Sequence, residues 1–460
     1  MNYNKNNAEN VKIAYIGGGS RGWAWGLMSD LVSQEDMSGS VYLYDIDCDA
    51  AKNNEIIGNK SSLADGAKSR WEYVAAQTVG EALTGADFTV LSILPGTFDE
   101  MYSDVHEPEK YGIYQSVGDT AGPGGILRAM RTIPMYVDIA EAIKKYAPDT
   151  WVINYTNPMS LCVWTLYRIF PGIKAFGCCH EVFGTQELLA DALREMRGTE
   201  GVKRSDICIN VQGINHFTWI NKANYRDIDL FDVYREFVDK FYETGYISDN
   251  SDHWINNSFA CAHRVKFDLF RRYGNIAAAG DRHLAEFMPG RQYLNSPETV
   301  REWKFGLTTV DWRKEDLKKR LDKSAELVSG KQSFEIKNTG EEGVNQMKAL
   351  LGLSTLVTNV NIPNMGQIPN LPLGAVVETN AVFRHNSLTP VFAGSMDNDI
   401  AALTLRHVYN HKTVLDGVLD GDRDKVFTAF LNDPLMTADR DSAKVLFDAM
   451  CKNTEKYLKF

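Results

Sequence analysis

A short apolar strand that breaks at three consecutive glycines and resumes at helical spacing constrains the fold most. In chain order, the parts are a strand at 11–16, the glycines Gly17–Gly19, a helical stretch at 23–32 and a second strand at 41–44. The second strand ends at Asp45. Strand, glycine turn, helix and strand in this order are typical of the unit that binds a dinucleotide.

Further strands continue this alternation through the first 200 residues. They are expected at 88–94, 150–154 and 174–178, each separated from the next by a helical stretch. Strands that alternate with helices predict a parallel sheet with crossover helices. We therefore expect residues 1–200 to form an α/β, doubly wound Rossmann-type domain that binds a dinucleotide.

The pattern changes after about residue 202. A strand at 207–213 is followed by long helical stretches, including 229–242 and 313–328. The second of these is highly charged, and we interpret it as a solvated helix face. Residues 201–460 are predicted to form a C-terminal α+β domain for catalysis and oligomerisation, in an overall arrangement like that of lactate dehydrogenase.

Composition excludes several classes of partner. The formal net charge of -11 argues against nucleic acid, because phosphate binding needs a basic face. The sequence shows neither a signal peptide nor an apolar run of about 18 residues, so no membrane partner is expected. Seven cysteines, two of them adjacent, fit a reducing compartment better than a disulfide framework, and we expect a cytoplasmic protein.

The glycine turn defines the expected cofactor site. Gly17, Gly19 and Gly22 have the G-x-G-x-x-G spacing, which lets the backbone approach a pyrophosphate at a helix N-terminus. An acid such as Asp45 at the end of the second strand binds ribose hydroxyls and favours NAD over NADP. The predicted cofactor-binding residues are Gly17, Gly18, Gly19, Ser20, Arg21, Asp45 and Asn154.

Cys179 and His216 each follow a short strand, where the ligand sites of α/β folds collect. A thiolate and an imidazole suit a borderline divalent metal ion, and two protein ligands leave positions open for substrate. Each residue alone is also compatible with a structural role, as a small core residue or a hydrogen-bonded polar group.

Six ordered motifs resemble those of the NAD- and divalent-metal-dependent glycosidases, family 4 of the glycoside hydrolases. They are IGGGS (16–20), GDTAGPGG (118–125), NYTNPM (154–159), CHEV (179–182), GINHF (213–217) and GDRHLAEFMP (280–289). The resemblance implies that Cys179 and His216 hold Mn²⁺ or another divalent metal. It also implies that Asn157 contacts substrate hydroxyls and that Asp119 lies near substrate and metal.

The resemblance also implies a mechanism outside the usual two-carboxylate hydrolysis. NAD⁺ oxidises C3 of the sugar, a base removes the C2 proton, the aglycone is eliminated, water adds and the hydride returns. Some members carry a Tyr as base in the segment that matches 280–287, but this sequence has Asp281 and His283 there. The catalytic candidates are His180, Asp281, His283 and Asp119, whereas Glu286 is interpreted as a structural acid in a helix.

The residues after Cys179 bear on the substrate. His180-Glu181-Val182 resembles the α-galacturonidase subgroup, which implies an α-galacturonide or a short oligogalacturonide. A uronate carboxylate requires an arginine, and the candidates are Arg128, Arg131, Arg282, Arg291 and Arg384. The predicted substrate-binding residues are Asn157, Glu181, Arg131 and Arg291. Family resemblance further implies a homodimer or homotetramer.

Alternatives remain open from the sequence. An α-glucosidase, an α-galactosidase or an α-glucuronidase of the same family differs only in the sugar. A 2-hydroxy-acid dehydrogenase shares the nucleotide domain but needs no metal, so a chelator separates the two classes. A non-catalytic NAD-binding sensor is disfavoured by the intact Cys179, His216 and Asn157.

Overall fold

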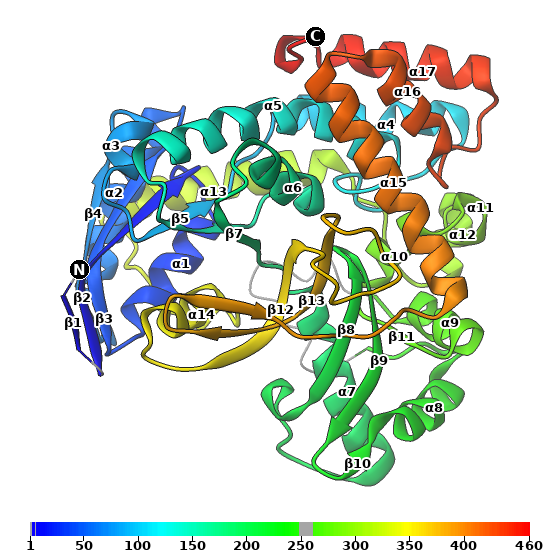
Figure 1. Ribbon diagram of the computed structural model, residues 1–460, viewed down its shortest axis with the longest axis horizontal. Coiled ribbons are helices and arrows are strands. Elements are labelled where there is room, and N and C mark those ends of the chain that lie inside the picture. The colour runs from blue at the N-terminus through cyan, green and yellow to red at the C-terminus, as the bar shows by residue number, and fades with distance from the viewer. Residues whose placement is uncertain (1, 5, 248–260) are drawn as a thin grey trace.

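The computed structural model describes residues 2–4, 6–247 and 261–460. Its strands form one large sheet and one small sheet, with helices packed around both (Figure 1). Among the described residues, no helix combines the length and the apolarity that a bilayer span requires.

The first half of the chain alternates strands and helices, as the sequence predicts. The elements are β1 (Asn2–Asn4), β2 (Asn7–Ile16), α1 (Trp23–Val32), β3 (Met37–Tyr44), α2 (Cys48–Ser61), β4 (Trp71–Ala75), α3 (Val79–Leu83), β5 (Phe88–Leu91), α4 (Phe98–His106), α5 (Gly122–Tyr146), β6 (Trp151–Asn154), α6 (Met159–Ile169), β7 (Lys174–Gly177) and α7 (Glu181–Arg197).

Six of these strands form the parallel core of the large sheet, in the order β7-β6-β5-β2-β3-β4. The chain order reverses between β2 and β5, so this is the switch point at which ligands of doubly wound folds bind. The predicted Rossmann-type architecture is confirmed.

The second half forms the small sheet and most of the remaining helices. The elements are β8 (Cys208–Ile214), β9 (Phe217–Tyr225), β10 (Ile228–Asp229), α8 (Leu230–Phe241), α9 (Arg264–Tyr273), β11 (Ile276–Ala277), α10 (Asp281–Phe287), α11 (Gly290–Tyr293), α12 (Pro297–Glu302), α13 (Val310–Ser329), α14 (Gly343–Leu351), β12 (Leu356–Pro363), β13 (Val376–Arg384), β14 (Ser387–Pro390), α15 (Asn398–Asp420), α16 (Arg423–Asn432) and α17 (Arg440–Asn453).

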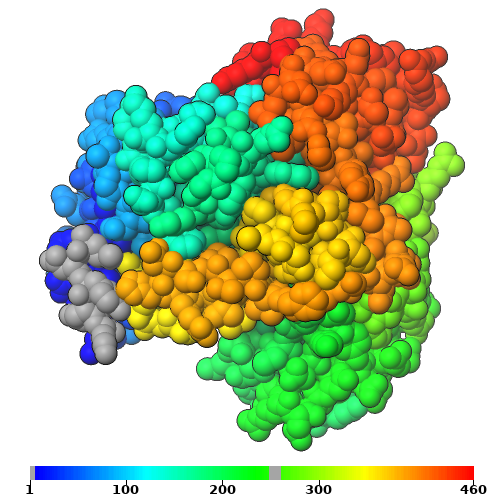
Figure 2. All heavy atoms as spheres, in the orientation of Figure 1, coloured from blue at the N-terminus to red at the C-terminus, as the bar shows by residue number. Residues whose placement is uncertain are grey.

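The second half also returns to the large sheet. Strand β12 pairs antiparallel with β7, and β13 and β14 extend the same edge. Helix α14 places Val344 and Met347 in the same core cluster as Ile13 and Val41 of the first half. Figure 2 shows this yellow and orange part of the chain between the blue and cyan first half and the green small sheet. Segments on both sides of residue 200 therefore share one core, and the division at 1–200 and 201–460 stays a prediction about folding units.

The fold places the sequence motifs at one edge of the large sheet. The glycine turn follows β2, Asp45 follows β3, Asn157 follows β6 and Cys179 follows β7. Because the carboxyl ends of parallel strands lie at the same edge, residues far apart in sequence are brought together there.

Candidate functional site

The glycine turn after β2 is held in place by backbone contacts that leave no room for side chains. Gly17 and Gly18 both donate their N–H groups to Tyr44 O at 2.9 Å. Gly17 has a φ of +92°, and a Cβ there would lie 2.0 Å from Ser92 O. The turn leads into α1, whose N-terminus carries no side-chain cap. Uncapped N–H groups at a helix N-terminus suit a phosphate group.

Asp45 lies beside this turn, where the sequence places the ribose-binding acid. Its Oδ2 accepts from Gly19 N at 2.8 Å, and its Oδ1 accepts from Asp47 N at 2.9 Å. Asn54 of α2, which the sequence analysis missed, donates to Gly18 O at 2.7 Å and to Ser20 O at 3.0 Å. The turn is therefore fixed on both sides by polar side chains of the same βαβ unit.

Helix α13 also reaches the turn. Arg320 donates from Nη1 to Arg21 O at 3.0 Å, and Arg21 lies 3.8 Å from Asp47 across an ion pair. Much of α13 is exposed, as the charged sequence predicts. The solvated face does not include Arg313 and Arg320, whose side chains are half-buried. The two arginines are seven residues apart and thus lie on one side of the helix. This spacing is the feature of the sequence from which a partly buried face could have been predicted.

Asn154 ends β6 beneath the site and is fully buried. Its Oδ1 accepts from Tyr136 Oη at 2.5 Å, and its Nδ2 donates to Thr156 O at 3.0 Å. Both ends of the amide are therefore engaged within the protein, and the cofactor contact of Asn154 stays a prediction.

Three predicted residues from separate segments converge beside this edge. The potential ligand atoms of Asp119, His216 and His283 lie within 4.8 Å of one another. The rings of His216 and His283 face each other at 3.7 Å between centroids. Thr120 connects the group, because its hydroxyl donates to Asp119 Oδ1 at 2.7 Å and lies 3.0 Å from His216 Nδ1.

His216 is presented by the tight turn between β8 and β9. Its φ is +65°, a left-handed conformation that is uncommon for a non-glycine residue. Such backbone strain persists where the surroundings fix it, often at functional sites. Here Thr120 on one side and the His283 ring on the other hold the imidazole.

Glu181 joins this cluster to His180. Its Oε2 accepts from Gly280 N at 2.8 Å, and its Oε1 lies 3.6 Å from His283 Nε2 and 3.8 Å from His180 Nε2. On the other side, His180 Nδ1 lies 3.2 Å from Glu341 Oε1. Glu341 lies in the segment before α14. Its contact with His180 could not be predicted from the sequence, because the two residues are far apart along the chain.

The ionisation of these groups follows from burial and charge. Burial lowers the pKa of His216 to about 3, so the ring is neutral at pH 7. At His180, burial by itself would lower the pKa of the imidazole. The nearby Glu341 carboxylate outweighs burial and raises that pKa to about 9. Burial raises the pKa of Asp119, but the neighbouring imidazoles and Arg128 outweigh it and hold the pKa below the usual range.

Cys179 is buried next to the cluster but does not belong to the three-residue group. Burial, with Glu378 and Glu181 nearby, raises the pKa of its thiol well above the usual value. Asn359 donates to Cys179 O at 3.2 Å and to Glu378 Oε1 at 2.6 Å. The thiol therefore carries a proton in the metal-free protein, and its role as a metal ligand stays a prediction.

Asn157 and Arg128 line the cluster on the side of the large sheet. Asn157 donates to Asp119 Oδ2 at 3.3 Å, and its own buried Oδ1 has no partner among the described residues. Arg128 is 8% exposed and donates from Nε to Asn157 O at 3.0 Å. For its two terminal amino groups, the described part of the chain provides no acceptor. Arg313 lies within electrostatic reach of both Asp119 and Arg128.

The other candidate arginines are placed differently. Arg131 forms a buried two-pronged ion pair with Asp104, at 2.9 and 2.5 Å, so its guanidinium is already used. Arg282 is buried and donates to Ser116 O at 2.5 Å. Arg384 is exposed at the end of β13. The substrate contact predicted for Arg131 would require breaking its pair with Asp104.

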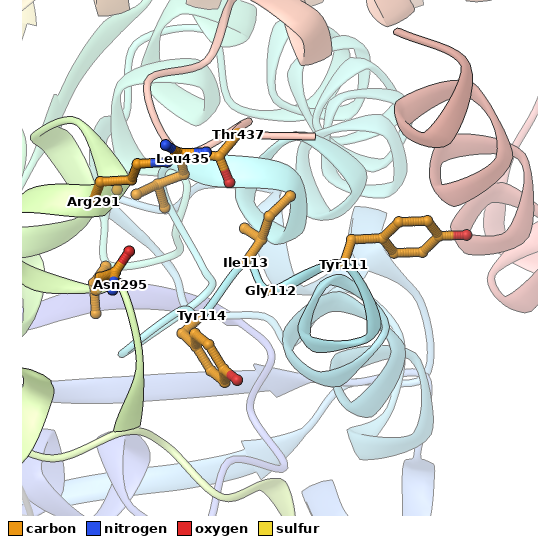
Figure 3. A pocket seen from close by; sticks show the side chains of 10 residues that line it. Tyr111, Gly112, Ile113, Tyr114, Arg291, Asn295, Leu435 and Thr437 are labelled. Atoms are coloured by element: carbon orange, nitrogen blue, oxygen red, sulfur yellow. The ribbon is translucent and has the colours of Figure 1, made fainter. Parts of the chain in front are cut away.

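Arg291 lines a separate cavity of about 250 Å³. Figure 3 shows it beside Asn295 and Leu435, facing the segment that carries Tyr111 and Tyr114. None of the three metal-competent residues lines this cavity. The substrate contact of Arg291 stays a prediction that belongs to this second cavity.

Asp281 and Glu286 both lie on α10, and both accept from backbone N–H groups. Asp281 accepts from Val265 N at 3.2 Å and Lys266 N at 3.1 Å, at the start of α9, and is grouped with Cys261 and His263 rather than with His283. Glu286 Oε1 accepts from Val117 N at 2.7 Å and Gly118 N at 2.9 Å. Glu286 thus holds the loop that carries Asp119, in agreement with a structural role.

The glycine turn and the three metal-competent residues thus lie at one edge of the large sheet. The family 4 glycosyl hydrolase model matches residues 12–195, and the model of the family 4 glycosyl hydrolase C-terminal domain matches residues 211–436. The chain belongs to this family of glycoside hydrolases.

Relatives with known names match over nearly the whole chain. An alpha-galacturonidase of Thermoanaerobacterium saccharolyticum is 64% identical over 100% of this chain and 98% of its own length. The alpha-galacturonidase of Bacillus subtilis is 53% identical over 96% of this chain and 97% of its own.

Solved structures agree with the fold. The crystal structure of lplD from Bacillus subtilis, described as a glucosidase, superposes with a TM-score of 0.91 at 53% identity, covering 96% of this chain and 100% of that one. A 6-phospho-alpha-glucosidase from gut microorganisms, in complex with NAD and Mn²⁺, superposes with a TM-score of 0.79 at 18% identity, over 98% and 99% of the two chains.

Proposed function

We propose that this protein is an NAD- and divalent-metal-dependent glycosidase that cleaves α-galacturonides. The observation that carries the proposal is the group Asp119, His216 and His283 beside Asn157, at the edge of a sheet that carries a dinucleotide turn. The substrate class is supported by relatives named alpha-galacturonidase at 53–64% identity. The predicted compartment and homo-oligomeric state stay predictions.

The donor set suits a divalent ion such as Mn²⁺. Imidazole nitrogen and carboxylate oxygen are ligands that first-row divalent metals accept. His216 is neutral at pH 7, as a ligand must be, and the described part of the chain offers no partner to the buried His283 Nδ1. His216 and Cys179 are the residues that the family resemblance assigns to the ion.

The turn after β2 suits NAD⁺. Gly17 and Gly18 bring the backbone close to the site, and the uncapped start of α1 offers N–H groups to a pyrophosphate. Asp45 at the end of β3 would repel a 2′-phosphate, which favours NAD over NADP.

The two groups supply different chemistry when bound: NAD⁺ accepts a hydride from C3 of the sugar, and the ion polarises the oxygens at C2 and C3. The side chains of the protein orient the sugar and hold the proton that is transferred. Asn157 Oδ1 accepts from a sugar hydroxyl, which satisfies an atom that has no partner within residues 2–4, 6–247 and 261–460. His180 is protonated at neutral pH and so holds a proton for the departing oxygen.

Arg128 is the arginine best placed to bind a uronate carboxylate. Its guanidinium is buried, its Nε is fixed by Asn157 O, and its terminal amino groups have no acceptor among the described residues. A carboxylate accepts two parallel N–H bonds from such a fork. Arg313 adds positive charge on the same side.

Turnover of nitrophenyl α-glycosides that differ only at C4 and C6 tests the function. We expect the α-galacturonide to exceed both the α-glucuronide and the α-galactoside in kcat/KM, and we expect EDTA to abolish turnover until Mn²⁺ is returned. In D₂O, the released sugar should carry deuterium at C2, because that proton is lost and regained. Equal kcat/KM on galacturonide and galactoside would overturn the substrate, and EDTA-resistant turnover without C2 deuterium would overturn the mechanism.

A further inference from the structure

The two ring nitrogens of His283 have different surroundings. Its Nδ1 is buried without a partner among the described residues, and its Nε2 lies 3.6 Å from Glu181 Oε1. Leaving a buried nitrogen unsatisfied destabilises the folded state, and an ion is one of the explanations for such an atom. The nitrogen also belongs to a residue whose ligand atom lies within 4.8 Å of those of Asp119 and His216.

The neighbouring His216 is oriented in a complementary way. Its Nδ1 lies 3.0 Å from Thr120 Oγ1, which leaves Nε2 as the nitrogen available to an ion. The two rings face each other with an interplanar angle of 31°, so both imidazoles are held by packing before any ion binds. Two fixed imidazoles and a carboxylate therefore offer three ligand atoms to one ion.

Glu181 is placed behind His283, on the side away from Nδ1. It begins α7, and Gly280 N, just before α10, donates to its Oε2 at 2.8 Å. A carboxylate that accepts from the second ring nitrogen of a ligand histidine fixes its tautomer and ring orientation and raises its basicity. Glu181 therefore fits this orienting role, whereas the sequence suggested contact with substrate.

We propose that Asp119, His216 and His283 together hold the divalent ion and that Glu181 is the positioning residue that orients His283. This proposal rests on the proposed function in that it requires a bound ion. It extends the ligand set beyond Cys179 and His216 and removes His283 and Asp119 from the acid–base candidates. Asp119 supplies a carboxylate oxygen, which first-row divalent ions accept as a ligand alongside imidazole nitrogen.

Mn²⁺ binding to the full-length protein in the presence of NAD⁺ tests the ligand set. Calorimetric titration gives the affinity, and pulsed electron paramagnetic resonance counts the imidazole nitrogens coupled to the ion. The test variants are His283→Gln and Glu181→Gln. The matched controls are His407→Gln, a buried histidine on α15 that contacts Phe287 O, and Glu341→Gln, a carboxylate that contacts His180 instead of His283.

We expect two coupled imidazoles in the unsubstituted protein and one in His283→Gln, with an Mn²⁺ affinity about 100-fold lower. Glu181→Gln should keep two imidazoles but bind about 10-fold more weakly, within the range typical of such supporting carboxylates. Both controls should bind Mn²⁺ as the unsubstituted protein does.

A single coupled imidazole in the unsubstituted protein would overturn the proposal, even if His283→Gln failed to fold. Unchanged affinity in His283→Gln, with Mn²⁺-dependent cleavage of the α-galacturonide intact, would overturn the ligand set and leave the proposed function standing. Absence of Mn²⁺ binding to the unsubstituted protein would overturn both.

Discussion

The dinucleotide turn and the metal-competent cluster are assembled in opposite ways. The turn is built from one βαβ unit, in which Tyr44, Asp45 and Asn54 fix residues 17–20 through hydrogen bonds to the backbone. The cluster of Asp119, His216 and His283, together with its neighbours Asn157 and Glu181, is built from side chains of five separate segments. The first site depends on backbone shape, and the second depends on side-chain chemistry.

This difference sets how each site should respond to substitution. A site made of backbone N–H groups loses one contact when a side chain is truncated, and its other contacts remain. A site made of converging ligands loses an essential donor and leaves buried charges without compensation. We therefore expect larger effects at the cluster than at the turn.

His216→Ala should produce the largest loss. Removing a ligand eliminates several kcal/mol of electrostatic stabilisation, which corresponds to a fall in kcat of about 1,000-fold for 4 kcal/mol. Steady-state cleavage of the α-galacturonide at saturating Mn²⁺ measures it. The control is His407→Gln, a buried histidine on α15 that contacts Phe287 O outside the cluster. Comparable losses in both variants would attribute the effect to packing.

Cys179→Ser should reduce activity by about 100-fold and weaken Mn²⁺ dependence at the same time. A serine hydroxyl stays protonated where a thiolate would bind, and the buried thiol must lose its proton when the ion enters. Activity against Mn²⁺ concentration is the measurement, and Cys178→Ser is the matched control. Full activity of Cys179→Ser in EDTA would exclude metal chemistry at this position.

Arg128→Met should remove the preference for the acid. A charge-assisted hydrogen bond contributes about 1.5–3 kcal/mol, so kcat/KM on the α-galacturonide should fall by up to about 100-fold. The α-galactoside should be affected less, and the ratio of the two is the readout. Arg291→Met, in the separate cavity, should leave that ratio unchanged. If the ratio were preserved in Arg128→Met but lost in Arg291→Met, the carboxylate would have to bind in the second cavity.

Asp45→Ala should weaken NAD⁺ binding by about 10-fold, because the lost ribose contact is worth at least about 1.5 kcal/mol. The turn should persist, since Asn54 still holds Gly18 O and Ser20 O. Fluorescence titration with NAD⁺ gives the Kd, and circular dichroism checks the fold. An unchanged Kd would remove Asp45 from the cofactor site, and the backbone alone would then define it.

The same contrast explains what the sequence could predict. The parallel sheet and the glycine turn follow from local patterns, and the structure confirms them near the expected residues. Cys179, His216, Asn157 and Asp119 were identified from motifs, but motifs do not reveal pairings across space. Glu341 and Arg313 come from segments with no local relation to the cluster, and Arg131, which the sequence offered as a substrate contact, is paired with Asp104 instead. Such relations depend on tertiary packing.

Glu286→Gln should have the smallest effect on activity, because a glutamine can still accept from the loop backbone, and its measurable effect is on stability. Burial raises the pKa of Glu286 to about 8, well above the value of about 4.3 for an unfolded chain. Between these values the folded state binds more protons than the unfolded state, so the stability of the unsubstituted protein falls as pH rises. A glutamine keeps an oxygen that can accept from Val117 N and Gly118 N but carries no charge. In EDTA, the variant should gain stability relative to the unsubstituted protein from about pH 4.3 upward, with the gain levelling off above pH 8. Urea unfolding at several pH values measures this difference. A difference that does not vary with pH would mean that Glu286 ionises normally, and the loop that carries Asp119 would then be held by a carboxylate rather than by a neutral acid.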